Sequence, residues 1–154
     1  MTTTTHAKLS QQAIVTAARQ IAREEGEAAI SIRKVAKSLN AGTMSIYHYI
    51  ESREDLLVAM LDRVALEIEY PPPHEKSEQD VIAVLSALYA SFKSEPWIID
   101  ALTRYDSASV HILPFVERVF VGLERMGFRD DELDELYWVM IEYTFGKVMS
   151  ERPL

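Results

Sequence analysis

One stretch of this chain, SIRKVAKSLNAGTMSIYHYIESR (residues 31–53), concentrates basic, hydroxyl and aromatic side chains. The guanidinium of Arg33 has the forked donor pattern that fits a guanine edge or a phosphate group. Tyrosine hydroxyls donate to phosphates, whereas small polar and apolar side chains fit base edges and thymine methyl groups. This combination favours contacts with double-stranded DNA. The residues of the stretch that we expect to face DNA are Ser31, Arg33, Thr43, Met44, Ser45, Tyr47, His48, Tyr49 and Arg53.

Each of these side chains also has an ordinary structural interpretation. A tyrosine on a short helix is more often half-buried packing than a DNA contact, and a single arginine more often lies in solvent or in an ion pair. Within the stretch we expect Tyr47 to contribute most to binding. Tyr49, between the phosphate backbone and the inside of the domain, should contribute most to stability.

No pattern in the chain indicates catalysis or a metal site. A glycine-rich phosphate loop, a cysteine pair and a His-Glu-x-x-His motif are all absent from the sequence. The four histidines lie far apart and lack the spacing of metal ligands. We therefore expect no catalytic residues, no metal and no cofactor, and a protein that is not an enzyme.

The charges divide the chain into two parts. The formal net charge is −8, but residues 1–55 hold seven Lys and Arg against six Asp and Glu, a net of +1. Residues 56–154 hold nine against eighteen, a net of −9. One interpretation is that the two parts have different electrostatic roles. The other is that the charges only lie on solvent-exposed faces.

The elements that must position the 31–53 stretch are helices. Apolar residues recur at helical spacing in eight segments, and we find no strand pattern, so the sequence predicts an all-α fold. Serines suited to N-caps precede the helices predicted from residues 11 and 32. The eight predicted helices cover about 10–26, 31–40, 43–50, 52–68, 77–92, 96–105, 111–127 and 130–144.

Three prolines at 71–73 interrupt the helical pattern, and we expect a linker at 71–76. The predicted domains are a helix-turn-helix domain at 1–55, with a disordered tail at 1–9, and a helical domain at 56–154. The first residues do not resemble a signal peptide, no apolar run is long enough to span a membrane, and cysteine is absent. These features favour a cytoplasmic protein.

Two short helices joined by Asn40-Ala41-Gly42 have the shape of a helix-turn-helix, in which the second helix enters the major groove. Residues 31–57 resemble the DNA-binding signature of the tetracycline-repressor-like (TetR) family. The matching positions are Ser31, Ala36, Leu39, Ile46-Tyr47, Tyr49-Ile50 and Arg53-Glu54-Asp55-Leu56. The turn departs from the family's Leu-Gly-Val-Ser pattern, although asparagine also tolerates the left-handed conformation. The resemblance implies that the residues expected to face DNA contact an operator.

The second part is similar to the region of that family that binds a small molecule and forms a homodimer through late helices. The resemblance implies a cavity for an apolar or aromatic effector. Its candidate residues are Tyr89, Phe92, Trp97, Leu102, Tyr105, His111, Phe115, Tyr137, Trp138 and Ile141. Ordinary core or interface packing is the alternative for each of them. Family chains usually continue for one or two more helices than this sequence predicts.

These features together predict a ligand-responsive, sequence-specific transcriptional regulator of the repressor type. Two other classes stay open. The scaffold could serve a helical small-molecule-binding protein or enzyme, or the chain could be a protein-interaction module that has lost DNA binding.

Overall fold

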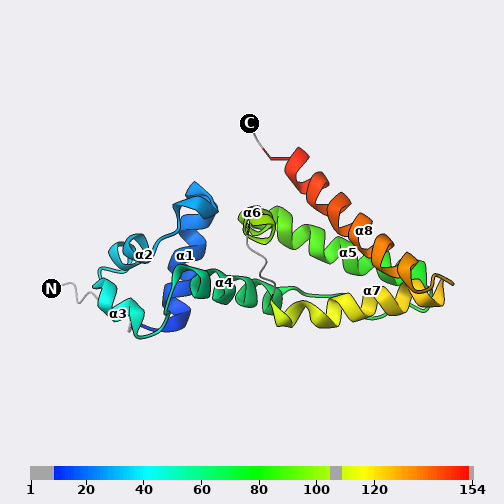
Figure 1. Ribbon diagram of the computed structural model, residues 1–154, viewed down its shortest axis with the longest axis horizontal. Helices are drawn as coiled ribbons and strands as arrows, with labels where there is room; N and C mark the ends of the chain where they lie inside the picture. The colour runs from blue at the N-terminus through cyan, green and yellow to red at the C-terminus, as the bar shows by residue number, and fades with distance from the viewer. Residues whose placement is uncertain (1–8, 105–108, 153–154) are drawn as a thin grey trace. The chain divides into compact units, whose positions relative to one another are not determined.

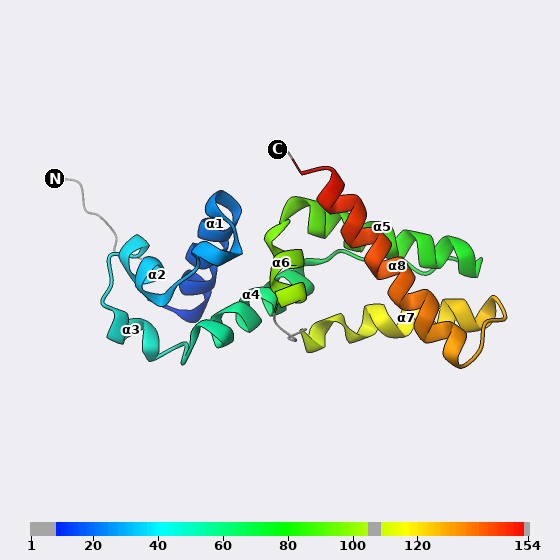
Figure 2. The ribbon, with the colours of Figure 1, turned by 45° about the horizontal axis from the view of Figure 1, so that its top comes forward.

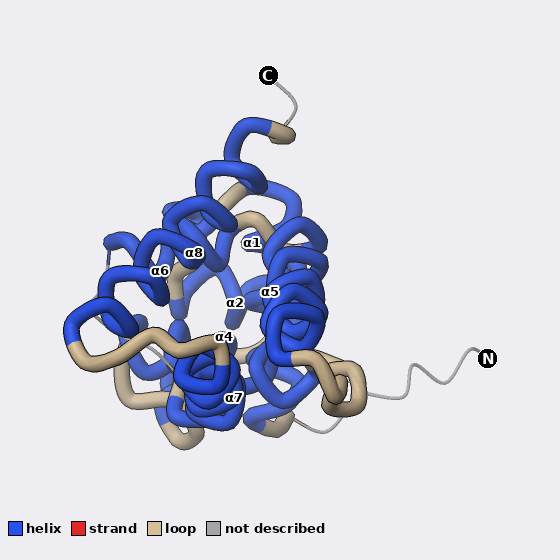
Figure 3. The backbone as a smooth tube through the Cα atoms, turned by 90° about the vertical axis from the view of Figure 1, so that its right-hand side faces the viewer, coloured by secondary structure: helices blue, strands red, loops and turns tan. Residues whose placement is uncertain are grey.

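The computed structural model describes residues 9–104 and 109–152, and in these residues only helices, turns and loops occur (Figure 3). The all-α prediction is therefore confirmed. The predicted disordered tail lies outside the described residues except for Leu9. None of the described helices combines the length and the apolar character that a membrane span needs.

The chain forms two compact units, one ending at Arg63 and the other beginning at Val64. The sequence placed a boundary between residues 55 and 56, in the first turn of the fourth helix, whereas this division falls eight residues later in the same helix. The functional domain limits stay a prediction. The two units are described separately below.

The N-terminal unit is built from four helices and one 3-10 turn (Figure 1). Apolar side chains pack between them, and Ile14, Val35, Ile46 and Leu56 are completely buried. The elements are α1 (Gln11–Glu25), η1 (Glu27–Ala29), α2 (Ile32–Ser38), α3 (Thr43–Tyr47) and the first part of α4 (Arg53–Glu67).

Local capping sets the limits of α1 and α2. The Ser10 hydroxyl accepts from the Ala13 N–H at 3.2 Å, and the Ser31 hydroxyl accepts from the Lys34 N–H at 3.2 Å. Gly26 ends α1 with φ +87°, a conformation that glycine adopts without strain. Asn40 takes the left-handed conformation after α2, with φ +52°, as the sequence predicted.

Helix α3 is shorter than predicted. It ends at Tyr47 instead of Ile50, and His48 and Tyr49 lie in a turn. The carbonyl of Ile46 accepts from the N–H groups of both Tyr49 and Ile50, at 2.9 and 3.1 Å. Ile50 is only 2% exposed, so the chain leaves the helix in order to bring this side chain into the core. The YHY sequence therefore spans a helix end and a turn.

The C-terminal unit packs α7 and α8 along α5 (Figure 2). Gly122 of α7 faces Val81 of α5 so closely that a Cβ atom at residue 122 would overlap the Val81 side chain. The elements are α5 (Ser77–Ser94), α6 (Trp97–Arg104), η2 (Val110–Ile112), α7 (Leu113–Arg125) and α8 (Asp131–Ser150).

A partly buried ion pair connects the proline segment to this unit. The Arg118 guanidinium on α7 donates to both carboxylate oxygens of Asp80 on α5, at 2.9 and 2.5 Å. It also donates to the Pro71 carbonyl at 2.7 Å, while Asp80 accepts from the His74 N–H at 2.8 Å. The hydrogen bonds from Arg118 hold the pKa of Asp80 at about 2. The predicted linker is thus tied to two helices by side chains.

Candidate nucleic-acid interface

The start of α2 presents a capped helix end beside an exposed cation. Ser31 is exposed and its hydroxyl caps the helix, which leaves other N–H groups of the first turn oriented outwards. Arg33 lies in that first turn and is also exposed. A helix N-terminus and a guanidinium are two groups that favour a phosphate.

The outer face of α3 is apolar and hydroxyl-bearing. Its buried anchor is Ile46, which is 0% exposed, while Met44 is 71% exposed and Tyr47 is 46% exposed. Thr43 and Ser45 are exposed beside them. Met44, Tyr47 and Tyr49 are large exposed side chains within six residues, and such a group is typical of a surface that contacts a partner.

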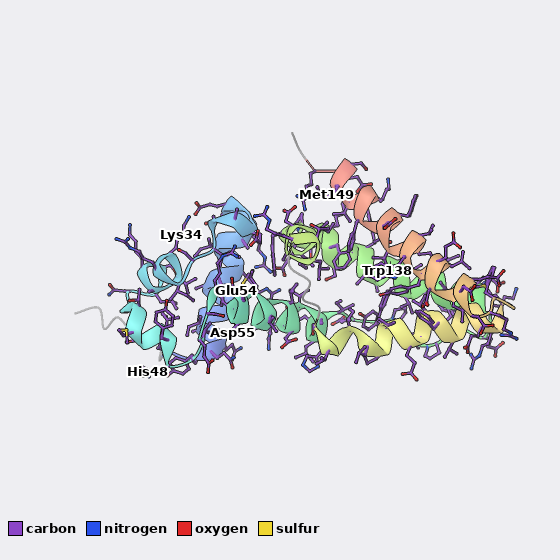
Figure 4. The ribbon with its side chains drawn as sticks, in the orientation of Figure 1. Lys34, His48, Glu54, Asp55, Trp138 and Met149 are labelled. Atoms are coloured by element: carbon purple, nitrogen blue, oxygen red, sulfur yellow. The ribbon has the colours of Figure 1, made fainter. Side chains whose placement is uncertain are left out.

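His48 and Tyr49 extend this surface past the end of the helix. His48 follows α3 directly and is exposed (Figure 4). The Tyr49 hydroxyl donates to the Leu9 carbonyl at 3.0 Å, and the residue remains 43% exposed. Tyr49 thus links the end of α3 to the segment before α1 while it remains exposed, and its contact with a phosphate stays a prediction.

Arg53 does not fit the expectation that it faces DNA. Its Nε donates to the Ile30 carbonyl at 2.9 Å and its Nη2 to the Glu27 carbonyl at 3.2 Å, and Nη2 also pairs with the Glu27 carboxylate. The Glu27 side chain is only 1% exposed. These bonds hold the guanidinium inside the unit, because a buried carboxylate needs a counter-charge. We therefore replace the predicted phosphate contact of Arg53 with a structural contact.

The candidate effector residues are spread between core and surface in the C-terminal unit. His111 is exposed and Trp138 is 59% exposed (Figure 4), so neither lines a buried cavity of this unit, contrary to the expectation. Phe92, Trp97, Phe115 and Ile141 are buried, Tyr89, Leu102 and Tyr137 are partly exposed, and Tyr105 lies outside the described residues.

A surface hollow of about 460 Å³ lies between α5 and α8. Tyr89 is the candidate residue that lines it, together with apolar side chains such as Ile82 and Val139. The Tyr89 hydroxyl donates to the Glu151 carboxylate at 2.5 Å. The remaining candidate residues described by the structure do not line this hollow.

Sequence reasoning missed Tyr70, which follows α4. Its hydroxyl is buried without a hydrogen-bond partner among the described residues, and its ring lies 5.9 Å from that of Phe115. Burial raises the pKa of Tyr70 to about 12, and the nearby Tyr137 contributes to the rise. The position after a helix and before three prolines gave no periodic signal that the hydroxyl would be buried. In the described part of the chain, no three acidic or histidine side chains come together as metal ligands would.

Comparison with known proteins finds a family match in the N-terminal part of the chain. Residues 14–60 match the family described as bacterial regulatory proteins, tetR family. The chain is also 31% identical over 147 residues to the HTH-type transcriptional repressor DrrR1 of Streptomyces coeruleorubidus. Residues 14–60 therefore carry a tetR-type sequence. DrrR1 is named as a transcriptional repressor, and the expectation that this chain is not an enzyme stays a prediction.

A second relative, an HTH-type transcriptional regulator of Saccharopolyspora erythraea, is 28% identical over 144 residues. The matches cover 93% of this chain but 54% of DrrR1 and 61% of the second relative. The chain therefore spans between half and two thirds of the length of these curated proteins.

Solved TetR structures share the fold. ActR of Streptomyces coelicolor, in complex with actinorhodin, superposes with a TM-score of 0.80 at 23% identity, covering 94% of this chain and 68% of ActR. BioQ with its natural double-stranded DNA operator gives 0.79 at 20% identity, covering 94% of this chain and 88% of BioQ. At these identities the likeness establishes the fold alone.

Proposed function

We propose that this chain acts in the cytoplasm as a homodimeric TetR-type repressor that binds operator DNA and is released by a small molecule. The observation that carries the proposal is the outer face of α3. There Met44 and Tyr47 are open to solvent while Ile46 anchors the helix in the core. Short apolar and hydroxyl groups on such a helix fit base edges in a major groove.

In this proposal the N-terminal unit reads DNA through two kinds of contact. Ser31 and Arg33 hold phosphates beside the groove, and Thr43, Met44, Ser45 and Tyr47 reach the base edges. His48 and Tyr49 lie where the phosphate backbone would pass. Two copies of the chain would place their recognition helices in successive major grooves, about 34–36 Å apart. BioQ, which shares the fold, has been crystallised with its operator.

The C-terminal unit would hold the effector. The buried hydroxyl of Tyr70 is a donor without a partner among the described residues, and the rings of Phe115 and Tyr137 lie close to it. These groups suit an apolar or aromatic molecule that carries an oxygen acceptor. ActR, with the same fold, has been crystallised with the small molecule actinorhodin.

Release from DNA would be a population shift between two conformations. A coupling of about 1–3 kcal/mol between the effector site and the DNA site changes operator affinity roughly 5–150-fold.

The test is a gel-shift series with the palindromic DNA beside the gene that encodes the chain. We expect sequence-specific retardation at low salt, and we expect Arg33→Ala to weaken it by about 1–3 kcal/mol. Arg125→Ala is the matched control, since Arg125 is an exposed arginine at the end of α7, far along the chain from α2 and α3. Equal weakening by both variants, or no specific retardation of the wild-type chain, would refute the proposal.

A further inference from the structure

A single guanidinium holds both ends of the η1 turn. Arg53, the first residue of α4, donates to the carbonyls of Glu27 and Ile30, at 3.2 and 2.9 Å, and forms an ion pair with the Glu27 carboxylate. The Glu27 side chain is 1% exposed and that of Arg53 is 25% exposed. This contact joins residues that are 26 positions apart in the sequence, within the N-terminal unit.

The η1 turn determines where α2 begins. Ile30 ends the turn with its N–H donating to the Glu27 carbonyl at 3.0 Å, and the next residue, Ser31, is the N-cap of α2. Ile30 is 2% exposed, so the turn cannot move without disturbing the core. Because α2 packs against both α1 and α3, a displacement of η1 would pass through α2 to the recognition helix.

We propose that the Arg53–Glu27 ion pair fixes the position of α2 and α3, the two helices that read DNA, relative to the first turn of α4. Operator affinity then depends on a carboxylate that does not touch DNA. This inference rests on the proposed function. Since α4 is the helix that leaves the unit, a displacement of α4 by an effector reaches α2 directly at this pair, in addition to passing along the chain through α3.

Two simpler roles lead to different expectations. If Arg53 only contacted a phosphate, a lysine at residue 53 would preserve operator affinity. Glu27 would then only reduce the positive potential around Arg53, and its removal would not weaken binding. If the pair only stabilised the unit, its loss would lower the melting temperature but leave the folded protein with normal operator affinity.

The first variant pair compares two carboxylates of equal charge. Glu54→Gln removes an exposed carboxylate from the first turn of α4 (Figure 4), and the loss of a negative charge should slightly strengthen DNA binding. Glu27→Gln removes the same charge from the ion pair. We expect Glu27→Gln to weaken operator binding by about tenfold, the typical effect of disturbing one specific contact. Removal of a negative charge alone would instead strengthen binding.

The second variant, Arg53→Lys, keeps the positive charge but removes the planar guanidinium group. In Arg53→Lys a single ammonium group replaces a guanidinium that bonds two carbonyls and a carboxylate at once. We expect operator affinity to fall by a similar factor, with an unchanged slope of log K against log salt. A simple phosphate contact would instead survive in this variant, because lysine carries the same charge, and the affinity would stay near the wild-type value. Affinities are measured at a temperature at which each variant is fully folded. Wild-type affinity in Arg53→Lys, or tighter binding by Glu27→Gln, would overturn the inference.

Hydrogen exchange without DNA gives a readout that does not depend on the proposed function. In the full chain, Glu27→Gln and Arg53→Lys should speed amide exchange over residues 28–47, while α5 and α7 keep their wild-type rates. Glu54→Gln should leave both regions unchanged. If the wild-type chain binds no operator, the proposed function fails. The exchange rates then still test whether the Arg53–Glu27 pair positions α2 and α3. Unchanged exchange over α2 and α3 in both variants would refute it.

Discussion

Tyr47 and Tyr49 lie two positions apart and are exposed to nearly the same extent, 46% and 43%, yet their hydroxyls have different surroundings. The Tyr49 hydroxyl donates to the Leu9 carbonyl, just before α1, across 40 residues of sequence. Tyr47 is the last residue of α3, on the face that we assign to DNA. Similar exposure therefore conceals two different contributions, one to the stability of the unit and one to binding.

We expect Tyr49→Phe to lower the free energy of unfolding by roughly 0.5–1.5 kcal/mol, because it removes one hydrogen bond. Tyr47→Phe removes a hydroxyl of the same kind from α3, and should change stability by less than about 0.5 kcal/mol while weakening operator binding. Urea denaturation of both variants and gel shifts with the operator measure these effects. Equal losses of stability in the two variants would contradict the distinction.

At the scale of the elements, packing of α5 against α7 depends on a glycine. Gly122 is buried in the last turn of α7, and a methyl group there would overlap Val81, which is itself 4% exposed. The second helical glycine, Gly146 of α8, is exposed and has open space around the position of a Cβ atom. The first glycine is required by helix packing, whereas the second only lowers the helix propensity of α8.

Gly122→Ala should therefore destabilise the C-terminal unit by about 1–3 kcal/mol, the usual cost of an added methylene in a packed core. Gly146→Ala should instead raise stability by about 0.4–1 kcal/mol, because alanine favours helix and reduces the entropy of the unfolded chain. Thermal unfolding of the two variants, followed by circular dichroism, measures both signs. A stabilising Gly122→Ala would show that α5 and α7 are not as close as described.

For the molecule as a whole, the charges follow the division into units. Residues 1–63 hold eight Lys and Arg against seven Asp and Glu, a net of +1, and the rest of the chain carries the remaining −9. A DNA-binding unit without excess negative charge and an acidic second unit suit the proposed function. Stability in acid depends on individual carboxylates, and one of them is Asp80, which pairs with Arg118 in the second unit.

The pKa of Asp80 is lowered from 3.8 to about 2 by the hydrogen bonds from Arg118. A depressed folded-state pKa contributes stability that is fully present above the unfolded value and is lost as the pH falls from about 4 to about 2. Asp80→Asn should therefore cost roughly 1–2 kcal/mol at pH 7 and progressively less across that interval. Urea unfolding at pH 7, 4 and 2.5 tests this, with the exposed Asp131→Asn as control. A cost that stays constant with pH would rule out the ionic contribution.

The sequence by itself determined the helical class, the course of the helices and the surface that faces outward in the helix-turn-helix. These features follow from local rules: serine caps, a left-handed asparagine and apolar residues at helical spacing act over a few residues. Only the tertiary structure decided the partners of Arg53, the end of α3, the link from Tyr49 to Leu9 and the burial of Tyr70. It also showed that Trp138 and His111 are exposed. Each of these depends on which segments pack together across tens of residues, and periodicity does not encode the partner of a charged or aromatic side chain.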